Sequence, residues 1–128
     1  MKKLFFGLLF LSLTLFASEL KFYNSMDTSL IDAKKSEKNI LLFLTQEGCP
    51  ACEYMKDVVL EDEVVKNYLL NNFLVVEYDI NKDGTPKGFK AYGTPTIYFL
   101  DSDKKEIAKK VVGARQKSDF LEILKKVK

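Results

Sequence analysis

The strongest constraint on the fold is a run of five apolar residues, Ile-Leu-Leu-Phe-Leu at positions 40–44. The run is too short for a helix. Because successive side chains of a strand point to opposite faces of a sheet, it places apolar groups on both faces. Such a strand is typical of the centre of a sheet that is covered on both sides. The chain must therefore supply helices for both faces, which indicates an α/β fold.

The remaining segments supply those helices and further strands. Apolar periodicity predicts helices over 27–38, over 61–71, over 87–92 and from Ser118 to the C-terminus. A further helical stretch is predicted after Pro50, with Cys52, Met55 and Val59 on one face. Strands are predicted over 73–78, 96–100 and 106–112, and the turn residues 101–103 make the last two a hairpin at one side of the sheet. We expect Asp27 and Ser118 to cap their helices, and Met26 to pack on Ile31.

The N-terminus has a composition of its own. Lys2 and Lys3 precede an apolar stretch that ends at the small residues Ala17 and Ser18. At about 13 residues this stretch is typical of a signal peptide. A membrane-spanning helix needs roughly 18 to 20 residues. We therefore predict a signal peptide over 1–17, a single domain over 18–128 and a periplasmic location, with an uncleaved anchor as the alternative.

Charge and composition exclude several classes of function. The chain has 20 basic and 18 acidic residues, so the domain without Lys2 and Lys3 is formally neutral. A neutral domain gives no reason to expect nucleic acid or an anionic membrane surface as partner. The absence of histidine excludes Ser-His and Cys-His nucleophile pairs, His-ligated metals and haem attachment. We expect no metal and no cofactor, and we expect a monomer.

Both cysteines of the chain lie in one motif, Cys49-Pro50-Ala51-Cys52, where the buried strand gives way to a helix. The unpaired N–H groups and the positive dipole end of a helix start stabilise a thiolate and lower its pKa. Cys49 would then be the exposed nucleophile, and Cys52, one turn along and facing inward, would resolve the mixed disulfide. The alternatives are a static disulfide and a copper(I) site, because two thiolates suffice to bind copper(I). A closed zinc site needs four ligands, and the missing ones would have to come from a second chain.

A second motif, Tyr92-Gly93-Thr94-Pro95-Thr96, places a proline at the start of an apolar strand. A strand boundary alone would explain it, but beside the cysteine motif a cis Thr94–Pro95 bond is the better prediction. With this order of elements, residues 27–127 resemble the thioredoxin superfamily, and most closely exported members such as the periplasmic C-terminal domain of thiol:disulfide interchange proteins. The resemblance implies a thioredoxin fold, with a mixed central β-sheet flanked by helices on both faces.

The resemblance also implies roles for individual residues. Cys49 matches the attacking cysteine and Cys52 the resolving one. Thr94 and Pro95 match the loop that binds an extended substrate segment and keeps metals off the thiols. The implied activity is that of a protein-disulfide oxidoreductase, with disulfide-containing or dithiol proteins as substrates.

Three departures from the cytosolic members concern the thiol chemistry. Gly48 replaces a tryptophan, Pro50-Ala51 replaces Gly-Pro, and Phe43 replaces the buried aspartate that serves the resolving thiol. Glu77 and Glu47 are the candidates to accept the Cys52 proton instead.

The direction of electron flow follows from the same motif. Pro50 removes an N–H donor at the helix start, and the histidine of strongly oxidising relatives is absent. We therefore expect a less depressed Cys49 pKa and a reductant, which needs a membrane electron-donor protein outside the cytosol. A different class of function stays open, namely a non-catalytic binding or copper-handling module that uses the same two cysteines.

Overall fold

A computed structural model gives the structure of residues 18–127. The predicted signal peptide at 1–17 lies outside the described residues. No helix within 18–127 combines the length and the apolar character that a membrane crossing requires.

The sheet has five strands, with β2 (Asn39–Thr45) at its centre. Its order is β1-β3-β2-β4-β5, where β1 is Phe22–Tyr23, β3 Phe73–Asp79, β4 Thr96–Leu100 and β5 Glu106–Val112. The strands β1, β3 and β2 are parallel, β4 is antiparallel to β2, and β5 is antiparallel to β4. The mixed sheet, its central strand and its hairpin edge are as predicted. The two-residue β1 was missed, because so short a segment shows no periodicity.

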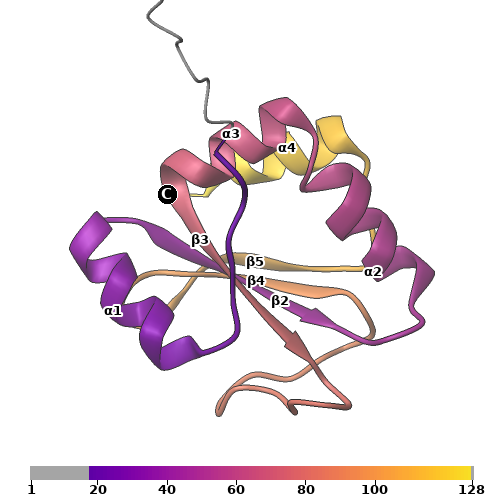
Figure 1. Cartoon of the computed structure of the whole chain (residues 1–128), viewed down its shortest axis with the longest axis horizontal. Coiled ribbons are helices and arrows are strands. Elements are labelled where there is room, and N and C mark those ends of the chain that lie inside the picture. Colours follow the sequence, from indigo (N-terminus) through magenta and orange to yellow (C-terminus); the bar gives the residue numbers. More distant parts are fainter. Residues whose placement is uncertain (1–17, 128) are drawn as a thin grey trace, which may run out of the picture.

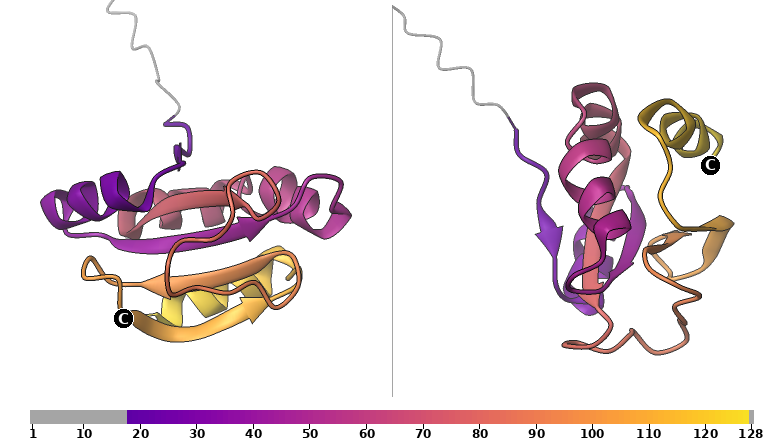
Figure 2. Two further views of the ribbon diagram at one scale, coloured as in Figure 1. Left: turned by 90° about the horizontal axis from the view of Figure 1, so that it is seen from below. Right: turned by 90° about the vertical axis from the view of Figure 1, so that its right-hand side faces the viewer.

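Helices cover both faces of this sheet, as predicted (Figure 1). α1 (Met26–Ser36) packs on one face. The other face carries α2 (Pro50–Tyr54), the π-helix η1 (Met55–Val59), α3 (Glu63–Asn72) and α4 (Lys117–Lys126). The left view of Figure 2 looks onto the sheet and shows α4 behind the β4–β5 hairpin.

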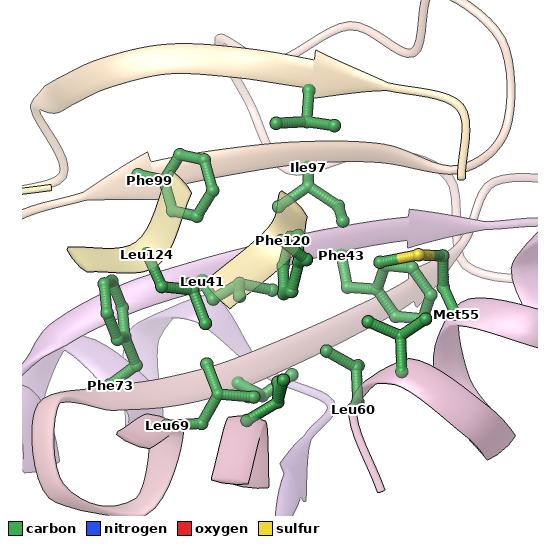
Figure 3. Close-up of a cluster of buried hydrophobic side chains, with 14 residues drawn as sticks. Leu41, Phe43, Met55, Leu60, Leu69, Phe73, Ile97, Phe99, Phe120 and Leu124 are labelled. Carbon is green, nitrogen blue, oxygen red and sulfur yellow. The ribbon is translucent and has the colours of Figure 1, made fainter. Parts of the chain in front are cut away.

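Each face of the sheet has its own apolar core. Figure 3 shows the larger one, in which alternate side chains of the strands meet those of η1, α3 and α4. Its fully buried members include Leu41, Phe43, Met55, Leu60, Leu69, Ile97, Phe99, Phe120 and Leu124. The smaller core joins α1 to the other face through Met26, Ala33, Ile40, Leu42, Leu44, Val76, Tyr98 and Leu100. The two sets alternate along β2, which is why the run at 40–44 is apolar throughout.

Three helix starts differ from the sequence prediction. α1 begins at Met26, and the Ser25 hydroxyl caps it by accepting the N–H of Thr28 at 3.4 Å. Met26 is buried while Ile31 is 57% exposed, so the predicted packing of Met26 on Ile31 is wrong. α3 begins two residues later than predicted, with Asp62 as its cap. α4 begins at Lys117 after Gln116, so Ser118 is not its cap.

The helix predicted over 87–92 is absent, and the segment is an irregular loop. Gly88 has φ +92°, in the left-handed region, and the Phe89 N–H bonds back to the carbonyl of the buried Pro86. Tyr98 then fixes the loop, because its hydroxyl donates to the carbonyl of Lys90 at 2.6 Å. Tertiary contacts with a strand residue therefore outweigh the local helical pattern.

Candidate functional site

The two cysteines lie where β2 ends and α2 begins, and they form a disulfide with Cα atoms 5.2 Å apart. Cys49 is the N-cap of α2, and its sulfur accepts the backbone N–H of Cys52 at 3.2 Å. Cys49 is partly exposed, whereas Cys52 is 4% exposed. The sulfur that a second protein can reach is therefore that of Cys49, and it has a backbone N–H donor at the helix start.

The loop before β4 faces this sulfur. The Thr94–Pro95 peptide bond is cis. The Thr94 hydroxyl donates to the Cys49 sulfur at 3.4 Å, and the Thr94 carbonyl oxygen lies 3.6 Å from the same atom. The N–H of Gly113 donates to the Pro95 carbonyl at 2.8 Å, which ties the loop to the end of β5. The sheet thus brings Thr94 and Pro95 to Cys49 across 45 residues of sequence.

An open hollow of about 230 Å³ adjoins the disulfide on the side of β3. Cys52 and Glu77 both line it, together with Lys56. The carboxylate of Glu77 bonds the Lys56 ammonium through both oxygens, at 2.8 and 3.0 Å. The structure therefore brings Cys52 and both predicted carboxylates, Glu77 and Glu47, to the same hollow.

The second predicted carboxylate has a different setting. Glu47 lies at the rim of the hollow, its side chain is 74% exposed, and it forms an ion pair with Lys82 at 3.0 Å. The Glu77 side chain is 23% exposed. Lys56 was not predicted from the sequence, although its position four residues after Cys52 places it on the same helix face.

Asp79, at the end of β3, ties together the segments around this hollow. Its carboxylate accepts the N–H groups of Glu47 at 3.0 Å, Asn81 at 3.0 Å and Lys82 at 3.1 Å. Partial desolvation raises the pKa of Asp79, but these three donors and the charge of Lys82 hold it below the ordinary value of 3.8. Asp79 thereby fixes the segment between β2 and Cys49.

We predict that Asp79→Ala lowers the stability of the protein at neutral pH. A carboxyl whose pKa is lower in the folded state stabilises the fold above its unfolded pKa, and this contribution is lost as the pH falls through the folded pKa. The urea midpoint of the variant should therefore lie below that of the parent at pH 7, and the difference should shrink below pH 3.8. Asp103→Ala, which removes only an exposed ion pair with Lys34, is the control. Equal midpoints at pH 7 would contradict this role.

Comparison with known proteins agrees with this geometry. A family model described as a thioredoxin-like domain matches residues 26–128. The chain is 31% identical over 98 residues to the thiol:disulfide interchange protein DsbD of Yersinia pestis, a match that covers 72% of this chain and 16% of that protein. It is 28% identical over 92 residues to protein disulfide-isomerase A3 of Gallus gallus, covering 70% of this chain and 18% of the isomerase. The chain thus spans less than a fifth of these curated relatives.

A solved structure matches along most of its length. The thioredoxin from Thermus thermophilus superposes with a TM-score of 0.72 and 27% identity, over 86% of this chain and 88% of that one. The likeness therefore extends over most of both chains.

Proposed function

The chain belongs to the thioredoxin-like domain family, and from this we propose that it is an exported thiol–disulfide oxidoreductase that reduces protein disulfides. The observation that carries the proposal is the setting of Cys49, which is partly exposed at a helix start. Its sulfur has one donor from the Cys52 N–H and another from the Thr94 hydroxyl. Both donors stabilise a thiolate, the form that attacks disulfides.

The reaction transfers two electrons in two exchange steps. The Cys49 thiolate of the reduced protein attacks one sulfur of the substrate disulfide, whose other sulfur leaves as a thiolate and takes up a proton. Cys52, once deprotonated, attacks the Cys49 sulfur and releases the second substrate thiol. The substrate ends as a dithiol, and the protein ends with the Cys49–Cys52 disulfide that the structure contains.

The loop at Thr94 and Pro95 is our candidate for holding the substrate during these steps. It faces the sulfur that forms the mixed disulfide, and its contacts with the sheet fix its position. An extended substrate segment that pairs with this backbone would present its disulfide to Cys49 without reordering the loop.

In this proposal Glu77, rather than Glu47, accepts the proton of the Cys52 thiol. Both carboxylates line the hollow with Cys52, but the Glu77 side chain is 23% exposed and ion-paired to Lys56, whereas the Glu47 side chain is 74% exposed and pairs with Lys82. The hollow is open to solvent, so a proton that Glu77 accepts can leave through water. Glu77 therefore replaces the carboxylate that thioredoxins place at the position of Phe43.

Replacing Glu77 by glutamine should slow the release of substrate from the mixed disulfide by about 10- to 100-fold, the usual effect of removing a proton acceptor. The attack of Cys49 should keep its rate, because that step does not need Glu77. Rapid acid quenching and mass spectrometry resolve the mixed disulfide from the products. Glu47→Gln is the matched control and should leave both steps unchanged, and a release step in Glu77→Gln with the parent rate and pH profile would refute the assignment.

Location and direction of electron flow complete the proposal. The basic start and apolar stretch of residues 1–17 support export to the periplasm. There, a reductant needs a supply of electrons, and a membrane protein with a dithiol is the class of donor that fits. The reduction potential of the cysteine pair against glutathione tests the direction, because a potential well below that of glutathione marks a donor of electrons.

An insulin-reduction assay separates this function from a binding or copper-handling role of the same cysteines. With dithiothreitol as donor, an oxidoreductase accelerates the precipitation of insulin chains. A binding module leaves the uncatalysed rate unchanged, and that result would overturn the proposal.

A further inference from the structure

A cationic aromatic cluster lies on the segment that leads to Thr94, the residue that contacts the Cys49 sulfur, and the chemistry proposed above does not use it. The side chain of Tyr92 is 57% exposed. The ammonium nitrogens of Lys90 and Lys110 each lie 5.5 Å from the centroid of its ring. We name Lys90, Tyr92 and Lys110 the Tyr92 cluster. Exposed cation–π contacts stabilise a fold only weakly, so stability alone is a poor explanation for an exposed ring with two ammonium groups.

The backbone holds this cluster close to the reactive sulfur. The Tyr92 N–H donates to the Thr96 hydroxyl at 3.1 Å, and that hydroxyl donates to the Gly93 carbonyl at 2.6 Å. Thr96 is fully buried, so both bonds are anchored in the sheet. Two residues after Tyr92, the Thr94 hydroxyl bonds the Cys49 sulfur. A segment bound along the loop at Thr94 therefore passes next to Tyr92.

The two ammonium groups of the cluster are largely uncompensated. Among residues 18–127, Lys90 has no carboxylate within ion-pair distance, and Lys110 has only Glu106, at 3.4 Å with both side chains partly exposed. An exposed pair of this kind contributes little. The Tyr92 cluster thus presents positive charge to any chain that approaches Cys49 from the β4 side.

The other side of the disulfide has the opposite charge. The hollow lies toward β3, which the central strand separates from β4 and β5. Five carboxylates and two ammonium groups line it, the carboxylates being Glu47, Glu53, Asp57, Glu77 and Asp79. A partner that crosses the site therefore meets positive charge on one side and negative charge on the other, which favours one orientation.

We propose that the Tyr92 cluster recognises an acidic residue next to the cysteine of an extended substrate segment, and so determines which protein disulfides this chain attacks. The inference rests on the proposed function. A substrate carboxylate beside Lys90 and Lys110 is attracted by two ammonium groups, while the carbons of its side chain pack on the Tyr92 ring. A basic residue at the same place is repelled. These contacts affect how fast the substrate associates with the protein. The two thiol–disulfide exchange steps described above stay the same.

The test uses three peptides that each contain one intramolecular disulfide and differ only in a glutamate, glutamine or lysine next to the first cysteine. The reduced protein is mixed with each peptide, the reaction is quenched with acid, and the peptide dithiol is measured by chromatography. At low ionic strength the glutamate peptide should react about tenfold faster than the lysine peptide, with the glutamine peptide between them. The ratio should fall towards one in about 0.5 M salt.

Two matched variants locate the source of this preference. Lys90→Gln combined with Lys110→Gln should bring the glutamate-to-lysine ratio close to one. Lys105→Gln, at the far end of the β4–β5 hairpin, removes one positive charge away from the site and should keep the parent ratio. A preference that survives in the double variant would overturn the role of the cluster.

The glutamine peptide separates the two proposals. If the protein reduces all three peptides at one rate, the inference about the Tyr92 cluster is wrong and the oxidoreductase function stands. If the protein reduces none of them, including the uncharged one, the proposed function is wrong and the inference falls with it.

Discussion

Replacing Cys49 by serine should abolish insulin reduction, with a loss on the order of a thousandfold or more, as expected when a reaction loses its nucleophile. Serine keeps the size of the side chain and its place at the N-cap of α2, but its hydroxyl does not exchange with a disulfide. The precipitation rate of insulin with dithiothreitol measures the effect. The variant should match the rate without protein.

Cys52→Ser is the informative companion. It leaves the partly exposed Cys49, the proposed nucleophile, and removes the buried thiol to which we assign the release of the mixed disulfide. The variant should therefore accumulate a covalent adduct with a disulfide peptide, visible by mass spectrometry and released by dithiothreitol. Adducts that form instead through Cys52 in Cys49→Ser would reverse the assignment of the two roles.

The stability of both variants has to be compared with that of the reduced parent. Closing so short a loop restrains the unfolded chain by only about 2 kcal/mol on the chain-entropy estimate. Reduced parent, Cys49→Ser and Cys52→Ser should therefore unfold at similar urea concentrations. If a variant loses activity while its urea midpoint is unchanged, the loss is due to the missing thiol and not to unfolding.

Replacing Phe43 by alanine should have the largest effect on stability, about 3–5 kcal/mol, as for other buried phenylalanines. Phe43 is fully buried in the larger core, opposite Glu77 of β3 and Ile97 of β4 (Figure 3). Its loss leaves a cavity next to Met55 of η1, the segment that directly follows α2. The predicted loss is a large fraction of the 5–15 kcal/mol typical of a domain.

Urea unfolding followed by circular dichroism measures this change. Ile31→Ala is the matched control, because Ile31 is 57% exposed and its truncation should change the free energy of unfolding by less than about 0.5 kcal/mol. A cost below about 1 kcal/mol for Phe43→Ala would show that this core does not depend on the ring.

The fold could be predicted wherever a local pattern is decisive. The run at 40–44 identified the central strand, and the turn residues 101–103 identified the hairpin. Helix caps were less predictable, because Ser25 and Asp27 are both good capping residues and only the backbone shows which one bonds the first turn. The loop at 87–92 depends on the Tyr98 hydroxyl, which no local window of sequence includes.

The sequence by itself determined the chemistry that this protein can perform. Its only two cysteines lie at the start of one helix, and the absence of histidine removes other nucleophile pairs. Periodicity and spacing are local properties, so they sufficed to place Cys49 outward and Cys52 inward.

The tertiary structure decided what surrounds these sulfurs. It brought Glu77 and Lys56 to the side of Cys52, turned Glu47 towards Lys82, and brought Lys110 to Tyr92. These neighbours come from separate strands and helices, and their proximity depends on strand order, register and side-chain packing, which a local pattern does not specify.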